Sequence, residues 1–168
     1  MNLGHSPVAR WGLRFLELTP DAKVLDCGCG GGANIKRLWK LCPKGTVRGI
    51  DDSPVSVEKS KRVNNAAVAR GRCDVLCASV AELPFESEQF DLVTASETVY
   101  FWPDLPQCFC EVGRVLKSGG TFLICIESNG DTDRDEKWTE IIGGMTIHKD
   151  TELKAYLEQA GFHDVQIH

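Results

Sequence analysis

The chain has 168 residues, with 24 acidic and 19 basic side chains, a formal net charge of −5 and 42% hydrophobic residues, enough for a single domain over residues 1–168. It contains no apolar run near the ~20 residues that cross a bilayer, and its first residues lack a basic-then-apolar export signal, so we expect a cytoplasmic protein without a membrane partner. The acidic balance also predicts no nucleic-acid partner, because phosphate binding needs clustered Lys and Arg.

The first predicted element is an amphipathic helix over residues 6–18. Ser6 is a suitable N-cap, and Pro7 suits the first turn of a helix. We expect residues 1–18 to form an N-terminal helix over the functional site. His5 precedes this helix directly and is therefore a candidate catalytic base.

The most informative segment is Asp26-Cys27-Gly28-Cys29-Gly30-Gly31-Gly32. It predicts a strand over 23–27 that runs into a glycine-rich turn and then into a helix over 32–41. Glycines let a ligand lie against bare backbone N–H groups, where a Cβ would collide. The segment therefore predicts a nucleotide-like cofactor. Because Gly28-x-Gly30-x-x-Ala33 also satisfies the dinucleotide fingerprint, an NAD-dependent oxidoreductase stays an alternative.

A second strand, predicted over 46–51, ends in an acidic residue. Asp51 lies about 20 residues beyond the glycines, which is typical of a carboxylate that binds a ribose. Such a carboxylate accepts hydrogen bonds from both ribose hydroxyls. This position favours an adenosine-containing cofactor but does not distinguish NAD from other cofactors that contain adenosine.

Strands and helices continue to alternate downstream. The expected elements are a helix over 54–70, strands over 73–79 and 90–95, a helix over 104–117 and a strand over 120–127. Only a short, Pro-containing stretch, 81–89, separates the third strand from the fourth, so the helix there is short or irregular. The alternation predicts an α/β fold with a Rossmann-like, doubly wound, mainly parallel sheet and helices on both faces. Ligands of such folds bind beyond the carboxyl ends of the strands.

Three further blocks discriminate between cofactors: Leu83-Pro84-Phe85, Phe90-Asp91-Leu92-Val93 and Arg114-Val115-Leu116-Lys117-Ser118-Gly119-Gly120. Together with the glycine turn and Asp51, they have the order typical of the class I S-adenosylmethionine-dependent methyltransferases, which the chain resembles over roughly residues 23–126. Its first residues and the segment 97–104 look like a bacterial branch of small members. The resemblance implies S-adenosyl-L-methionine as cofactor, S-adenosyl-L-homocysteine as product, and methyl transfer to a small-molecule acceptor.

The resemblance also implies roles for individual residues at the turn. Gly28, Gly30 and Gly32 would carry the methionine and ribose portion of the cofactor. Asp26 would anchor the turn and the amino group, and Asp51 would bind the ribose. The Asp two residues before the first glycine, like the downstream blocks, disfavours the NAD alternative.

Other residues are expected around adenine and the transferred methyl group. Ser79 and Val80 would flank adenine, with Ser79 in place of the Asp that is common there. Asp52 stands where the family usually has an apolar or aromatic residue against adenine. Glu97 would lie beside the methionine end and is a candidate acid–base group, with a helix-capping role as the alternative. Tyr100 is a further catalytic candidate, and an ordinary core aromatic is its alternative.

The eight cysteines are interpreted as reduced, mainly buried thiols, and their spacing predicts no metal site. The alternative is a soft-metal substrate such as arsenite, which some members of the family methylate by binding it through thiolates.

The last part of the chain predicts a substrate cover over 128–150, a helix over 151–160 and a strand over 162–168. Members of the family normally place one more antiparallel strand between the fifth strand and this last one, and we expect it to be missing here. An open edge invites pairing with another chain. The oligomeric state therefore stays open between a monomer and a homodimer. The activity stays open between an active enzyme and a cofactor-binding domain without turnover.

Overall fold

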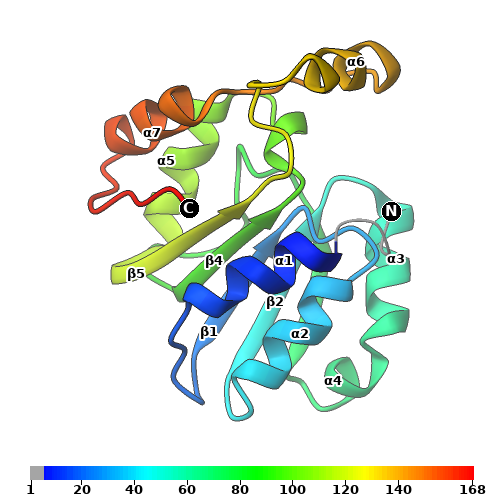
Figure 1. The fold of residues 1–168 in the computed structure, drawn as a ribbon. Helices are drawn as coiled ribbons and strands as arrows, with labels where there is room; N and C mark the ends of the chain where they lie inside the picture. Colours follow the sequence, from blue (N-terminus) through cyan, green and yellow to red (C-terminus); the bar gives the residue numbers. More distant parts are fainter. Residues whose placement is uncertain (1–5) are drawn as a thin grey trace.

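Five parallel strands form the sheet of the computed structural model, which describes residues 6–168 (Figure 1). The strands are β1 Lys23–Cys27, β2 Thr46–Asp51, β3 Cys73–Cys77, β4 Phe90–Ser96 and β5 Leu116–Cys125. Their order is β3-β2-β1-β4-β5, and every neighbouring pair is parallel. The chain builds outward from β1 to one side and then, from β4, to the other. The ligand crevice of such a sheet opens where the order reverses, between β1 and β4.

Helices cover both faces of this sheet. They are α1 Ser6–Gly12, the 3-10 turn η1 Leu13–Phe15, α2 Ala33–Leu41, α3 Pro54–Val63, α4 Asn65–Ala69, the 3-10 turn η2 Val99–Phe101, α5 Leu105–Val115, α6 Asp133–Ile141 and α7 Asp150–Gln159. The predicted doubly wound fold is confirmed. None of the helices in the described part of the chain is long and apolar enough to cross a membrane.

Consecutive residues of β1 are buried in two hydrophobic cores, one on each face of the sheet. Val24 packs with Ile35 and Leu38 of α2 on one face of the sheet, whereas Leu25 packs with Val112 of α5 on the other. All five side chains are fully buried. Side chains alternate along a strand, so a sheet with both faces covered needs apolar residues at consecutive positions.

Several predicted boundaries are corrected by the structure. The helix expected over 54–70 is two helices, because the chain leaves helical geometry at Asn64. The helix expected over 6–18 ends as the turn η1 at Phe15, and the fifth strand begins at Leu116. The strand expected over 162–168 is wrong: this segment has no regular structure and forms no ladder with a described strand, although its Phe162 packs against Phe122 of β5.

Candidate cofactor site

The glycine turn joins β1 to α2 through three left-handed residues. Gly28, Gly30 and Gly32 have φ values of 69°, 51° and 79°, a region that costs glycine nothing and strains other residues. A Cβ on Gly28 would collide with the hydroxyl of Thr98, whereas one on Gly30 would meet no atom within 4 Å. Gly28 is therefore needed for packing against the end of β4. The open space beside Gly30 is a cradle in which a ligand reaches the backbone.

Asp51 fastens this turn to the end of β2. Its Oδ2 accepts a hydrogen bond from the Gly30 amide at 2.8 Å, and its Oδ1 accepts one from the Ser53 amide at 3.1 Å. The carboxylate is partly exposed. Since an ionised carboxylate has about four acceptor sites, it retains capacity for ligand hydroxyls. The structure thus brings the predicted ribose ligand next to the predicted glycines.

Asp26 is buried at the base of the turn with one oxygen left over. The Thr94 hydroxyl and the Asn34 amide donate to its Oδ1 at 2.6 and 2.9 Å, while its Oδ2 has no hydrogen-bond partner among the described residues. Burial raises the pKa of Asp26 to about 6, against the opposing effect of these two donors. An unpaired carboxylate oxygen on a residue that is 1% exposed suits a cationic donor such as an ammonium group.

Sequence reasoning missed Asn34 and Thr94. Thr94 lies opposite Asp26 in the β1–β4 pairing, and Asn34 is the second residue of α2. A polar residue inside the apolar strand 90–96 was the available signal for Thr94. Nothing in the local pattern of α2 distinguishes Asn34 from an exposed helix residue.

The residues predicted to flank adenine follow the ends of β2 and β3. Ser79 is exposed and its hydroxyl accepts from the Ala81 amide at 3.2 Å, whereas Val80 is buried in the core beneath. Asp52 is exposed, and the thiol of Cys77 lies 3.5 Å from its carbonyl oxygen. Strand pairing puts Asp51 and Cys77 side by side, so these residues share the rim that carries the glycine turn.

Glu97 follows β4 in a left-handed conformation with φ 56°. Its amide donates to the Cys125 carbonyl at 2.8 Å, and its Oε1 accepts from the Glu127 amide at 2.5 Å. A non-glycine residue held in this region is strained, and such strain tends to occur at functional sites. The carboxyl of Glu97 thus lies between the ends of β4 and β5, on the far side of the turn from Asp51.

Tyr100 is buried, and both its hydroxyl and its backbone carbonyl form hydrogen bonds. Its hydroxyl accepts from the amides of Glu127 and Ser128 at 3.1 and 3.0 Å, and its backbone carbonyl accepts from the Thr146 amide at 2.8 Å. Burial raises the pKa of this hydroxyl well above its usual value. Such geometry favours a role in holding the segment after β5, and the predicted catalytic role stays a prediction. The other catalytic candidate, His5, lies outside the described residues.

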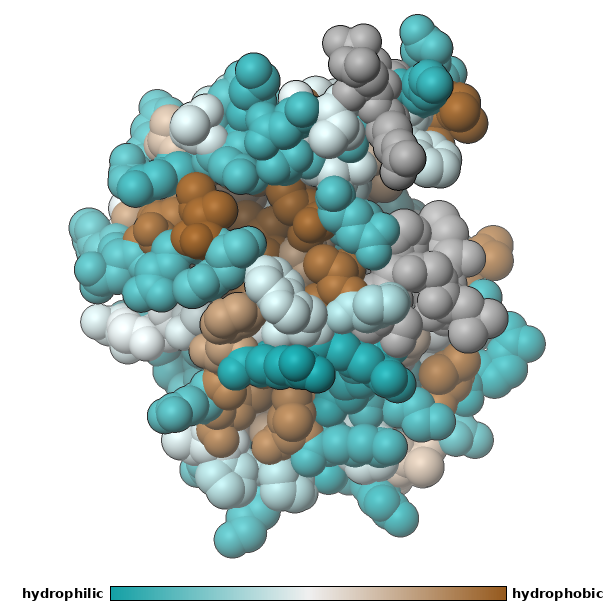
Figure 2. Space-filling view, viewed as in Figure 1, coloured by the Kyte–Doolittle hydropathy of each residue, from teal (hydrophilic) through white to brown (hydrophobic). Residues whose placement is uncertain are grey.

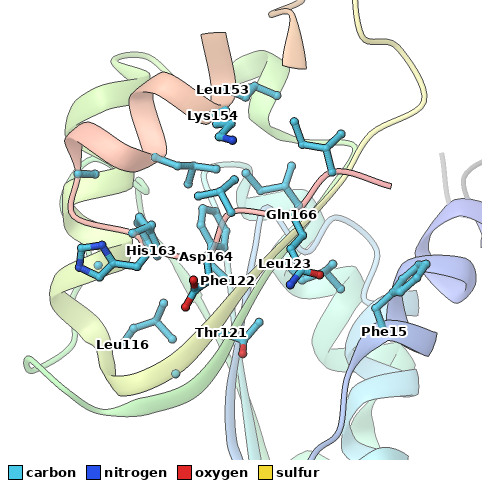
Figure 3. Close-up of a pocket in the computed structure, with 18 of the residues that line it drawn as sticks. Phe15, Leu116, Thr121, Phe122, Leu123, Leu153, Lys154, His163, Asp164 and Gln166 are labelled. Atoms are coloured by element: carbon cyan, nitrogen blue, oxygen red, sulfur yellow. The ribbon is translucent and has the colours of Figure 1, made fainter. Parts of the chain in front are cut away.

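A large groove lies elsewhere, along the outer edge of β5. We name it the edge groove. It encloses about 1170 Å³ between β5, the segment 160–168, α7 and the first helical turns. Figure 3 shows Phe122 and Leu123 on one side of it, Leu153 above and Phe15 at one end. In Figure 2 the corresponding region is a recess with an apolar floor and a hydrophilic border. The groove reaches Glu127 but does not include the glycine turn.

Among the side chains that the structure describes, no group of three His, Cys, Asp or Glu is arranged to hold a metal ion. Six of the eight cysteines are buried, and Cys77 and Cys110 are exposed on different elements.

Comparison with known proteins identifies the family. Residues 25–124 match the family model described as "Methyltransferase domain". Cycloartenol-C-24-methyltransferase 1 of Oryza sativa subsp. japonica is 34% identical over 109 residues, which is 65% of this chain and 31% of the relative. Cycloartenol-C-24-methyltransferase of Arabidopsis thaliana is 31% identical over 156 residues, 88% of this chain and 46% of the relative. The chain therefore spans less than half the length of these relatives.

A solved structure has the same fold at high similarity. It is the methyltransferase in complex with the Trm112 methyltransferase activator of Haloferax volcanii. The TM-score is 0.89 and the identity 25%, over 96% of this chain and 70% of that one. The glycine turn, Asp51 and the L-P-F and F-D-x-V blocks all fall within residues 25–124, which match the family model. The chain belongs to the class I S-adenosylmethionine-dependent methyltransferases.

Proposed function

We propose that this chain binds S-adenosyl-L-methionine at the glycine turn and transfers its methyl group to a small-molecule acceptor in the cytoplasm. The observation that carries the proposal is the pairing of an open backbone cradle at Gly30 with an orphaned buried oxygen on Asp26. A ligand with an ammonium group beside a ribose would fill both. NAD carries no ammonium group, so it would leave the Asp26 oxygen without a cationic hydrogen-bond donor.

Each carboxylate has a separate task in this proposal. Asp26 would accept from the ammonium group of the methionine portion, and Asp51 would accept from the ribose hydroxyls while keeping the Gly30 amide in place. Asp52, Ser79 and Val80 would surround adenine. Because Asp52 offers a charge where an apolar surface suits adenine better, we expect moderate rather than tight binding of the cofactor.

The cofactor supplies an electrophilic methyl group on a sulfonium, so the protein's main contribution is to hold an acceptor in line with it. Positioning of this kind supplies up to about 7–11 kcal/mol of a barrier. Glu97, held by the Glu127 amide, would orient a donor atom of the acceptor or take its proton. Tyr100 would hold the segment at 127–128 that closes this side of the site.

The acceptor is proposed from the named relatives. Both are cycloartenol C-24-methyltransferases, which supports a small organic acceptor and makes a carbon atom the first kind of acceptor to test. The rival proposal is a domain that binds the cofactor without turnover, because the sheet within residues 6–168 lacks the last antiparallel strand.

A binding experiment tests the cofactor proposal first. Calorimetry with S-adenosyl-L-homocysteine should detect binding to the parent, and Asp51→Ala should weaken it by about 1.5–3 kcal/mol, because a charged acceptor of hydroxyls is lost. Thermal-shift assays with NAD provide the matched comparison. Stabilisation by NAD but not by S-adenosyl-L-homocysteine would refute the proposal.

Turnover needs a second experiment. Small-molecule extracts incubated with methyl-labelled S-adenosyl-L-methionine and the protein should yield a labelled product, whose mass identifies the acceptor. Binding of S-adenosyl-L-homocysteine without any labelled product would favour the rival, a cofactor-binding domain.

A further inference from the structure

Asn64 reaches the glycine turn from the junction of α3 and α4. Its side-chain amide donates to the carbonyl of Gly32 at 3.0 Å and to the carbonyl of Ser60 at 3.0 Å. Asn64 is 3% exposed and Ser60 is fully buried. The same segment makes one weaker bond to the turn, from the Cys29 thiol to the Ser60 hydroxyl at 3.8 Å.

The carbonyl that Asn64 holds belongs to a conformationally demanding residue. Gly32 is left-handed, with φ 79°, and is the N-cap of α2. Its carbonyl also accepts the first amide bond of that helix, from Lys36 at 3.2 Å. The fit is close, since a Cβ on Gly32 would lie 2.6 Å from the Asn64 amide nitrogen. Asn64 thus fixes the peptide at which the turn becomes a helix.

The same helix pair touches both halves of the candidate site. The chain enters α3 from Asp51 and Ser53, and Ser53 caps the helix by accepting from the Ser56 amide at 3.4 Å. It leaves α3 at Asn64, 32 positions after Gly32 in the chain. A rigid helix with one end on the ribose-side carboxylate and the other on the turn keeps these two groups at a constant separation.

We infer that Asn64 is a positioning residue for the cofactor: it sets the conformation of the glycine turn from outside the site, through Gly32. This inference rests on the proposed function, since the turn is taken to be the cofactor cradle. Of the residues proposed to bind the cofactor, the Asn64 side chain forms a hydrogen bond only with the turn, at Gly32. Its effect is therefore on how well the turn is organised before binding.

The test replaces Asn64 by leucine, which has a similar volume and no amide. We expect Asn64→Leu to weaken S-adenosyl-L-homocysteine binding about tenfold. The variant loses the buried hydrogen bond from the Asn64 amide to the Gly32 carbonyl, and a tenfold change corresponds to about 1.4 kcal/mol of stabilisation of the turn in its binding conformation. Asn64→Ser, which is too short to reach Gly32, should do the same and serves if the leucine variant does not fold. The adjacent Asn65→Leu, at an exposed position, should leave affinity unchanged.

A second control separates positioning from stability. Val57→Ala removes buried volume from the core against which α3 packs but takes no side-chain hydrogen bond from the turn, and should lower stability while leaving the affinity of the folded protein within about twofold. Equal loss of affinity in Val57→Ala would show that Asn64 acts only by stabilising the fold, and would overturn the inference.

Hydrogen exchange of the free protein makes the result independent of the proposed function. The amides of Gly32 and Lys36 should exchange faster in Asn64→Leu than in the parent, with no cofactor present. If these amides are unaffected, the inference is wrong. Should they respond while the parent binds no S-adenosyl-L-homocysteine, the inference about the turn stands and the proposed function fails.

Discussion

At the scale of single residues, Asp26 combines a cost to stability with a role in binding. Its ordinary pKa of 3.8 is raised to about 6, first of all by burial. A raised acid pKa means that the folded state prefers the protonated form. The destabilisation is therefore absent below about pH 3.8, grows between pH 3.8 and 6, and is fully present above pH 6. A cationic ligand group beside the free Oδ2 would offset it.

Asp26→Asn should consequently stabilise the free protein and impair binding. At pH 7.5 we expect the free energy of unfolding to rise by about 1–3 kcal/mol, as a shift of about two pKa units implies. The advantage over the parent should narrow at pH 4.5. Urea unfolding at both pH values measures this, and calorimetry should show at least tenfold weaker S-adenosyl-L-homocysteine binding. A variant less stable than its parent at pH 7.5 would contradict the assignment of an unrelieved buried charge.

At the scale of elements, two of the family's sequence blocks prove to be parts of one structural clamp. Arg114 of α5 donates to the carbonyls of Phe85 and Leu83 at 2.8 and 3.1 Å. It also forms a bidentate pair with Glu111 at 2.7 and 2.8 Å, and Glu111 in turn accepts from the Leu83 amide at 2.9 Å. The R-V-L-K block thus holds the L-P-F loop in place. This loop follows directly after Ser79 and Val80.

Arg114→Met should destabilise the fold by about 1–3 kcal/mol, because two loop carbonyls and a carboxylate lose a charged donor. Arg114→Lys should recover little of that loss, since an ammonium cannot replace the planar fork. Urea unfolding measures both, with Arg70→Met, at an exposed position after α4, as the matched control. If Arg114→Lys is as stable as the parent, the positive charge alone accounts for the stabilisation by Arg114, and the planar fork is not needed.

The elements predicted correctly from sequence are those decided by local chemistry. Lys23–Cys27 and Thr46–Asp51 match their predicted strands, because short apolar runs between turn residues have one plausible role. The break at Asn64 was not predicted, since the sequence around Asn64 does not show that its side chain bonds to Gly32, which is distant in sequence. The strand predicted over 162–168 failed because a strand needs a partner, which a local pattern of alternating residues does not supply.

The candidate site shows the same division. The glycines and Asp51 were predicted to lie together because cofactor binding demands particular residues at a particular spacing, and the structure joins Gly30 to Asp51 directly. Asn34, Thr94 and Asn64 were missed. Each acts through a hydrogen bond to a group on another element, and in sequence each is an unremarkable polar residue within a helix, a strand or a helix junction.

At the scale of the whole molecule, the two sheet edges differ in how they are protected. The β3 edge is five residues long and includes the acidic Asp74, and both features discourage pairing with another chain. β5 is ten residues long, but its register with β4 shifts after Leu116, so regular pairing runs over Thr121–Cys125. This part of the strand faces the edge groove. Phe122, Leu123 and Ile124 are only partly buried there. Its outer peptide groups have no strand partner within residues 6–168.

The unpaired β5 edge should make the chain, as a protein of residues 1–168, associate with rising concentration. Exposed apolar strand edges pair readily with other chains, and Phe122, Leu123 and Ile124 give this part of β5 that character. Thr121 is an exposed residue of this edge and lines the edge groove (Figure 3), so Thr121→Lys would place a charge where a neighbouring chain must approach. We expect this variant to weaken association about tenfold or more, as a desolvation cost of about 1.4 kcal/mol implies.

Sedimentation velocity between low and high micromolar concentration measures this association, with Thr19→Lys, at an exposed site outside the groove, as control. A parent that stays monomeric throughout this range would show that the segment 160–168 and the first helical turns shield the edge well enough by themselves.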